Sequence, residues 1–139
     1  MENVLTRDTS QAVELIGRLE ARSATIGIVG MGYVGQPLAL RYAETGFRVL
    51  GYDVDSEKAA ELNAGHSSIE HIDDAAIARA VANGRFEVTV DMARAVEADA
   101  LIICVPTPLN KYREPDLGFV IGTMESVGST PCAKARPRH

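Results

Sequence analysis

Residues 25–35 have the sequence Thr-Ile-Gly-Ile-Val-Gly-Met-Gly-Tyr-Val-Gly, in which a short apolar run leads into the pattern G-x-G-x-x-G. A run that is apolar at nearly every position is typical of a parallel strand buried on both faces. Helical spacing follows as far as Gly46, with Pro37 in the first turn, and a second apolar run over 47–52 ends at Asp53. The stretch therefore predicts a strand, a glycine-rich turn, a helix and a second strand.

The glycine spacing and Asp53 together indicate a dinucleotide site. Gly30 would allow a tight turn, Gly32 a close approach of the backbone to a pyrophosphate, and Gly35 close packing of the helix on the strand. Asp53 lies 18 residues beyond Gly35, where a carboxylate accepts hydrogen bonds from the adenosine ribose. Such a carboxylate would repel a 2′-phosphate, so the expected cofactor is NAD rather than NADP. The alternatives are a structural turn and a solvated aspartate.

Strands and helices continue to alternate after residue 53. We expect strands over 86–90 and 100–105, helices over 57–64, 92–98 and 117–127, and a helix from Asp73 or Asp74 to Asn83-Gly84. An amphipathic helix over 8–22, capped by Asp8 or Thr9, precedes them and is expected to pack against the main domain. Alternation of this kind predicts an α/β protein with a parallel sheet and right-handed crossovers.

The expected fold is a Rossmann-type doubly wound parallel sheet, truncated after about four strands in the order 3-2-1-4, with a leading amphipathic helix. We divide the chain into an N-terminal helix (1–24), an NAD-binding domain (25–126) and an aperiodic basic tail (127–139). In this topology the loops after the first and fourth strands face each other across the cofactor. Thr107, in Pro106-Thr107-Pro108, is therefore a candidate donor to the nicotinamide half, with a strand-terminating turn as an equal alternative.

Composition and charge argue against several classes of protein. The 139 residues are 46% hydrophobic and 24% charged, as in an ordinary globular domain. The net charge of −5 argues against a nucleic-acid partner, and it falls to −8 over 1–126 because 127–139 holds three basic residues and no acid. No apolar run approaches the roughly 18 residues of a membrane span, and the N-terminus lacks a signal-peptide pattern. Cys104 and Cys132 offer neither a disulfide framework nor zinc spacing, so we expect a cytoplasmic protein without a metal site.

Three segments of the chain resemble the UDP-glucose/GDP-mannose dehydrogenase family. Residues 26–39 and the sequence Gly-Tyr-Asp-Val-Asp at 51–55 look like the opening of that family. The sequence Cys-Val-Pro-Thr-Pro-Leu-Asn-Lys-Tyr-Arg-Glu-Pro-Asp-Leu at 104–117 is similar to the branch that acts on UDP-N-acetylhexosamines, above all to UDP-N-acetylglucosamine 6-dehydrogenases. Residues 67–72 and the leading helix fit the same branch.

This resemblance implies an activity and a set of cofactor-binding residues. The family oxidises the C6 hydroxymethyl group of a nucleotide sugar to a carboxylate with two NAD. A base takes the alcohol proton as hydride leaves, a cysteine captures the aldehyde, and a second hydride transfer gives a thioester that water hydrolyses. The positions that match the family's cofactor-binding residues are Gly30, Gly32, Tyr33, Val34, Gly35, Asp53, Lys58 and Thr107. For Lys58, a solvated helix lysine is an equal alternative.

The resemblance does not extend to the sugar-binding half of the family, which holds the nucleophilic cysteine. We therefore assign no catalytic residue and expect the chain alone to lack turnover. Cys104, in the middle of an apolar strand, is interpreted as a buried inert thiol. Residues 127–139 resemble nothing in the family, and we weigh a frameshifted gene end, a cloning artefact and a deliberate truncation as their origin.

Two other functions remain open from the sequence. One is a free-standing NAD-binding module that senses cofactor or complements a separate polypeptide, and the other is an unrelated Rossmann protein such as a methyltransferase. The fourth strand would present an unpaired apolar edge, which predicts self-association, as a homo-oligomer, or marginal stability.

Overall fold

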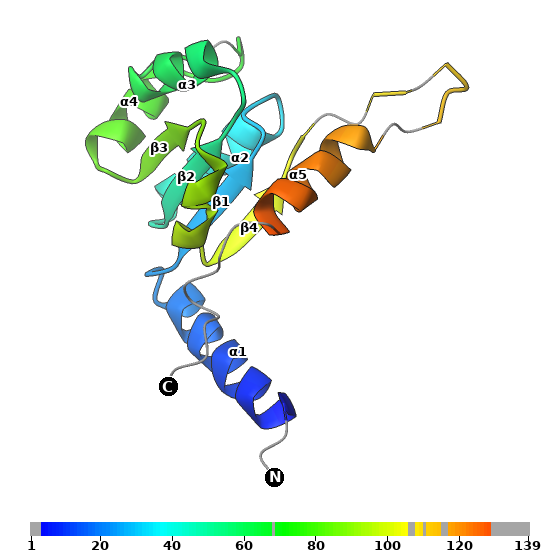
Figure 1. The fold of residues 1–139 in the computed structure, drawn as a ribbon. Coiled ribbons are helices and arrows are strands. Elements are labelled where there is room, and N and C mark those ends of the chain that lie inside the picture. Colours follow the sequence, from blue (N-terminus) through cyan, green and yellow to red (C-terminus); the bar gives the residue numbers. More distant parts are fainter. Residues whose placement is uncertain (1–3, 68, 106–107, 110, 115–116, 129–139) are drawn as a thin grey trace.

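Four parallel strands build the sheet that the glycine-rich segment begins (Figure 1). They are β1 (Thr25–Val29), β2 (Arg48–Tyr52), β3 (Phe86–Thr89) and β4 (Ala100–Ile103), and they lie in the order β3-β2-β1-β4. The computed structural model describes residues 4–67, 69–105, 108–109, 111–114 and 117–128. Strand direction and order agree with those expected from the sequence, so the Rossmann-type α/β fold is confirmed.

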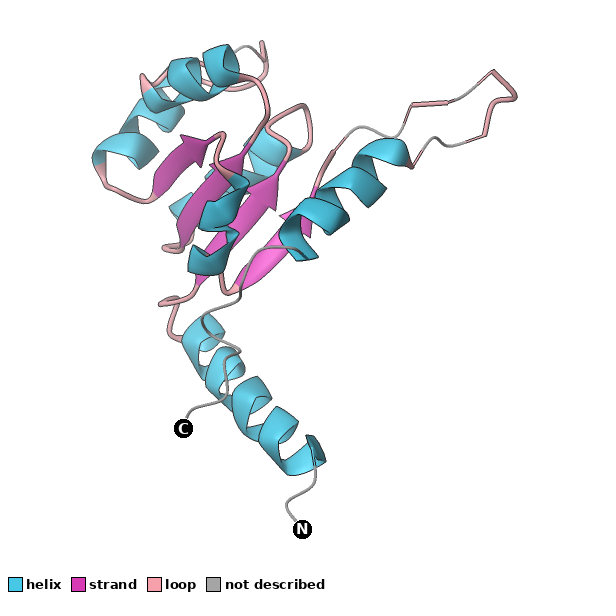
Figure 2. Ribbon diagram, in the orientation of Figure 1, coloured by secondary structure: helices cyan, strands magenta, loops and turns pink. Residues whose placement is uncertain are grey.

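Two apolar clusters, one on each face, hold helices against the sheet (Figure 2). Successive strand side chains point to opposite faces, so Ile26 and Ile28 belong to one cluster and Val29 to the other. The first cluster buries α2 (Gly35–Glu44), α3 (Ser56–Asn63) and α4 (Asp74–Ala82). The second buries Ala95 of the 3₁₀ helix η1 (Met92–Glu97), and α5 (Gly118–Gly128) contacts η1.

Aspartate side chains fix the starts of three helical segments. Asp55 accepts hydrogen bonds from two backbone N–H groups at the start of α3, at 3.0 and 3.2 Å. Asp73, rather than Asp74, is the N-cap of α4, and Asp91 caps η1 in the same way. These short side chains satisfy N–H groups that have no partner within the helix, which is why the sequence located these starts well. Asp116, the expected cap of α5, lies outside the described residues.

The leading helix α1 (Val4–Glu20) differs from the expectation in two respects. It begins at residue 4, so Asp8 and Thr9 lie inside it and neither is its cap. It also extends away from the sheet (Figure 1), and Val13 and Ile16 are 63% and 53% exposed. In its last turn, Leu19 packs on the main core.

An ion pair joins the end of α1 to the sheet. The guanidinium of Arg18 donates two hydrogen bonds to the carboxylate of Asp99, one of them 2.9 Å long, and the Asp99 side chain is only 2% exposed. The same carboxylate accepts the backbone N–H of Thr25 at 2.7 Å. A buried carboxylate needs such partners, since an unpaired charge inside a protein is strongly unfavourable.

Candidate cofactor site

Two glycines of the β1–α2 loop lie where the protein leaves no room for a side chain. Gly30 has a φ of +99°, and a Cβ there would lie 2.6 Å from the carbonyl oxygen of Cys104. A Cβ on Gly35 would lie 1.8 Å from the carbonyl oxygen of Gly30. Gly32 differs from both, because its φ is not positive and a Cβ there would have no neighbour within 4 Å. The folded chain itself therefore requires glycine at 30 and 35 but not at 32.

The N-terminus of α2 is left without a side-chain cap. Val34 is the N-cap residue and makes no capping hydrogen bond. The first turn of a helix carries N–H groups without intrahelical partners and a partial positive charge. This helix end, next to the open position at Gly32, is suited to an anionic group such as a pyrophosphate.

Asp53 connects the end of β2 to the glycine loop. Its Oδ2 accepts the backbone N–H of Met31 at 2.9 Å, and its Oδ1 accepts the N–H of Asp55 at 3.0 Å. The ammonium of Lys58, in the first turn of α3, lies 3.6 Å from Oδ2. The Asp53 side chain is 10% exposed, so it is held in place and still reaches solvent. Each carboxylate oxygen has a second lone pair that a ribose hydroxyl can use.

These residues surround one pocket of about 650 Å³, a volume within the usual range for ligand sites. Six of the eight residues expected from the sequence line it: Gly30, Gly32, Tyr33, Val34, Asp53 and Lys58. Gly35 is buried beneath the loop against Gly30, and Thr107 lies outside the described residues. The pocket lies at the carboxyl ends of β1 and β2, where open α/β sheets bind their ligands.

Several pocket residues were missed by the sequence reasoning. Val90 and Met92 line the pocket between the end of β3 and the start of η1, and α5 contributes Gly122, Thr123 and Ser126. Val90 follows β3 as Asp53 follows β2, so its place after a parallel strand was a usable signal. The contribution of α5 had no such signal, because it depends on how that helix packs beside η1.

A buried glutamine also supports the loop. Gln36, 1% exposed, donates from Nε2 to the carbonyl of Met31 at 2.7 Å, and its Oε1 accepts the hydroxyl of Ser67 at 2.6 Å. Burying an amide is unfavourable unless both of its ends are hydrogen-bonded, and here both are. Gln36 therefore fixes the backbone of Met31, whose own N–H contacts Asp53.

Cys104 requires a correction. It does not lie in the middle of a strand, because β4 ends at Ile103, and it is partly exposed at the wall of the pocket. The backbone N–H of Cys104 still donates to the carbonyl of Val29 at 2.7 Å, and a Cβ on Gly30 would collide with the Cys104 carbonyl. Burial raises the pKa of the Cys104 thiol, which favours the protonated and less reactive form. The expected inertness therefore has a physical basis although the expected burial was wrong.

The described part of the chain shows neither a metal centre nor a membrane segment. No group of three or more His, Cys, Asp and Glu residues within it is arranged to hold a metal ion. Among the helices that the structure describes, none has the length and apolar character to cross a membrane. The imidazole of His66 is exposed and lies 3.4 Å from the carboxylate of Asp74.

Comparisons with known proteins agree with this geometry. Residues 24–134 match the model of the UDP-glucose/GDP-mannose dehydrogenase family, NAD binding domain. The match ends eight residues beyond the boundary expected at 126. The chain is 34% identical over 104 residues to the UDP-N-acetyl-D-mannosamine dehydrogenase of Escherichia coli K12. It is 31% identical over 103 residues to the UDP-N-acetyl-D-glucosamine 6-dehydrogenase of Pseudomonas aeruginosa. These alignments cover 75% and 74% of this chain and 24% of each relative.

Solved structures show the same relationship. The crystal structure of a ternary complex of GDP-mannose dehydrogenase from Pseudomonas aeruginosa has a TM-score of 0.70 at 34% identity, over 74% of this chain and 24% of that one. The UDP-D-ManNAc dehydrogenase of Pyrococcus horikoshii has a TM-score of 0.71 at 31% identity, over 77% of this chain and 26% of that one. The chain thus spans about a quarter of the length of the relatives that it matches. It belongs to the UDP-glucose/GDP-mannose dehydrogenase family and corresponds to the NAD binding domain of that family.

Proposed function

We propose that this chain is the cofactor half of an NAD-dependent UDP-N-acetylhexosamine 6-dehydrogenase, and that on its own it binds NAD without oxidising a sugar. The observation that carries the proposal is the position of Asp53. Its carboxylate is fixed by two backbone N–H groups at the mouth of the pocket, beside the open position at Gly32. In a full-length protein of this kind, the substrate would be a nucleotide sugar and the protein would be located in the cytoplasm.

The pocket residues can be assigned to successive chemical groups of NAD. Asp53 would accept the hydroxyls of the adenosine ribose, and the pyrophosphate would lie against Gly32 at the N-terminus of α2. Tyr33 and Val34, 80% and 65% exposed, would flank the pyrophosphate on the solvent side. Bound NAD would supply the hydride acceptor for oxidation of the sugar alcohol.

Lys58 would act through Asp53 as well as on the ligand. Its ammonium is 3.6 Å from Oδ2, which orients the carboxylate while leaving the Lys58 side chain 31% exposed. An ionised Asp53 disfavours a 2′-phosphate by charge repulsion, so the site should discriminate against NADP. The positive charge of Lys58 would reduce the preference for NAD over NADP without reversing it. Asp53 is the less exposed of the two side chains and is hydrogen-bonded to the glycine loop.

A second candidate is an NAD-binding module that complements a separate polypeptide. The outer edge of β4 supports it, because within the described residues β4 pairs only with β1. A free strand edge can accept a further strand from another chain. Restored dehydrogenase activity on mixing with the part of the Escherichia coli relative that the alignment does not cover would favour this candidate, whereas an inactive mixture would count against it.

Calorimetric titration with NAD and NADP tests the main proposal. We expect wild-type protein to bind NAD in preference to NADP, and Asp53→Asn to bind NAD about tenfold more weakly, as expected for a lost charged hydrogen-bond acceptor. The control is Glu61→Gln, which makes the same change of charge at an exposed position on α3. Equal NAD affinity in all three proteins would show that Asp53 does not bind the cofactor. Absence of NAD binding by the wild type would overturn the proposed function.

A further inference from the structure

One wall of the pocket is built on a weak element of secondary structure. Val90 and Met92 line the pocket at the junction of β3 and η1. η1 is a six-residue 3₁₀ segment, and its turn hydrogen bonds from Arg94 to Asp91 and from Ala98 to Ala95 are both 3.2 Å long. Short 3₁₀ segments have poor hydrogen-bond geometry and low intrinsic stability. The position of this wall therefore depends on contacts that join η1 to the neighbouring strands.

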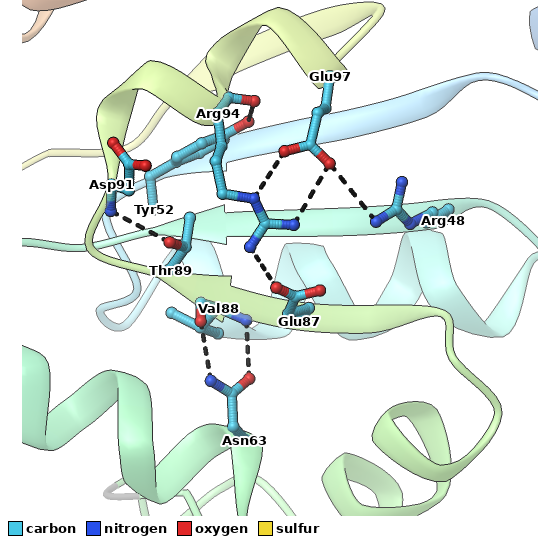
Figure 3. A network of polar contacts seen from close by, with 9 residues as sticks. All are labelled: Arg48, Tyr52, Asn63, Glu87, Val88, Thr89, Asp91, Arg94 and Glu97. Carbon is cyan, nitrogen blue, oxygen red and sulfur yellow. Dashed lines mark hydrogen bonds and ion pairs between the residues drawn. The ribbon is translucent and has the colours of Figure 1, made fainter.

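Arg94 makes those contacts (Figure 3). Its Nε donates to Glu97 Oε2 at 2.6 Å, and a terminal nitrogen donates to Glu97 Oε1 at 3.3 Å. Its other terminal nitrogen donates to Glu87 on β3. The guanidinium thus joins two points of η1 to the neighbouring strand, which its planar, forked set of donors makes possible.

Two further contacts tie the same segment to β2. Glu97 lies 3.8 Å from a guanidinium nitrogen of Arg48, and the buried hydroxyl of Tyr52 donates to the backbone carbonyl of Arg94 at 2.9 Å. Tyr52 immediately precedes Asp53 and itself lines the pocket. The contacts of Arg94 therefore connect η1 to the two strands whose carboxyl ends form this side of the pocket.

We propose that Arg94 is a positioning residue for the cofactor site: by bridging Glu87 and Glu97 it holds η1 so that Val90 and Met92 form a ready apolar wall for the adenine ring. The inference rests on the proposed binding of NAD. Adenine is the group assigned to this wall because the wall is apolar and lies next to Asp53, which takes the adjoining ribose. A wall already in place spares the cofactor the entropy of ordering it on binding.

The charged side chains of this network are partly exposed, so removing Arg94 should affect the pocket wall rather than the stability of the whole domain. The side chains of Arg94, Glu97 and Glu87 are 28%, 35% and 47% exposed. Ion pairs that are this exposed contribute little to global stability and are weakened by salt. Loss of Arg94 should therefore change the pocket wall more than it changes the fold.

The test compares Arg94→Met with Arg79→Met, which removes the same charge from the exposed face of α4. Titrations with NAD and with AMP should show that Arg94→Met binds both about threefold to tenfold more weakly, while Arg79→Met binds them as the wild type does. Amide hydrogen exchange without ligand should accelerate in η1 but not in β1 or β2. High salt should narrow the difference between wild type and Arg94→Met, because it screens the network of the wild type.

A second variant separates positioning from general destabilisation. Glu97→Gln should weaken AMP binding by a similar factor, and the double variant with Arg94→Met should be no weaker than Arg94→Met alone, because both residues act through one contact. Unchanged AMP and NAD affinity in Arg94→Met, or unchanged exchange in η1, would overturn the positioning role. A wild type that binds neither ligand would overturn the proposed function and this role with it.

Discussion

The side-chain amide of Asn63 on α3 pairs with both backbone groups of Val88 on β3, donating to its carbonyl and accepting its N–H, each at 2.8 Å. The amide thereby takes the place of a neighbouring strand along the outer side of β3 (Figure 3). An edge strand blocked in this way is a poor template for pairing with another chain. At the other edge of the sheet, β4 has no equivalent cover within the described residues.

This difference between the two edges predicts association through β4. Ala100–Ile103 contains no charge and no proline, and Ile103 is 37% exposed. We expect the chain to form dimers or larger species at micromolar concentrations, and Ile103→Lys to shift it towards monomer, as measured by sedimentation velocity. The control is Val13→Lys on α1, which removes an exposed apolar residue away from the sheet edge. A wild type that sediments as a monomer over the whole range would rule out this association.

Substitution of glycine by alanine should have opposite effects at positions 35 and 32 of the glycine loop. Gly35→Ala forces a Cβ against the Gly30 carbonyl and should destabilise the fold by about 3 kcal/mol. Gly32→Ala has open space around the new methyl group, so its melting temperature should stay near that of the wild type. NAD affinity of Gly32→Ala should nevertheless fall about tenfold or more, because the methyl group occupies the path of the pyrophosphate. Wild-type affinity in a folded Gly32→Ala would place the pyrophosphate elsewhere.

Tyr52 predicts a loss of stability at alkaline pH. Burial, with a smaller contribution from the charge of Glu97, raises the pKa of Tyr52 from 10 to about 12. The folded state therefore keeps this proton over a pH range in which the unfolded chain has lost it. The stabilisation that this provides is complete below pH 10 and is lost as pH rises from 10 to about 12.

Tyr52→Phe should remove this pH dependence. At pH 7 the variant should be less stable by about 1 kcal/mol, since it loses the hydrogen bond to the Arg94 carbonyl. Urea unfolding at several pH values should show the gap between wild type and variant closing above pH 10. The control is Tyr112→Phe, which changes an exposed tyrosine in the same way. If the difference in unfolding free energy between wild type and Tyr52→Phe stayed constant up to pH 12, the buried environment assigned to the Tyr52 hydroxyl would be contradicted.

Cys104 gives a chemical readout of cofactor binding. Because Cys104 lines the pocket and burial raises the pKa of its thiol, alkylation in a Cys132→Ser background should be slow at pH 7 and faster at higher pH. Saturating NAD should slow it further, about tenfold, by covering the thiol, whereas NADP at the same concentration should protect less. Equal alkylation rates with and without NAD would mean that the cofactor does not reach this wall.

The order of elements and the main features of the site could be predicted from the sequence because their causes are local. The glycine spacing, the apolar runs and the aspartate N-caps each act within a few residues of one another, and they located the strands and the starts of α3, α4 and η1 closely. The position of Asp53 beside the glycine loop followed from topology, since the ends of adjacent parallel strands meet at one edge. These features require no knowledge of side-chain packing.

Tertiary structure decided the features that depend on residues far apart in the chain. The expected packing of α1 proved wrong for Val13 and Ile16, which are exposed, whereas Leu19 packs on the core and Arg18 pairs with Asp99. Cys104 is partly exposed because it follows the last residue of β4 and lines the pocket. The contacts of Arg94 with Glu87, and of Asn63 with Val88, join elements whose approach no local pattern encodes. Local sequence thus determined which elements form and their approximate positions, whereas long-range packing determined which side chains meet, because that depends on the distances between elements after the chain has folded.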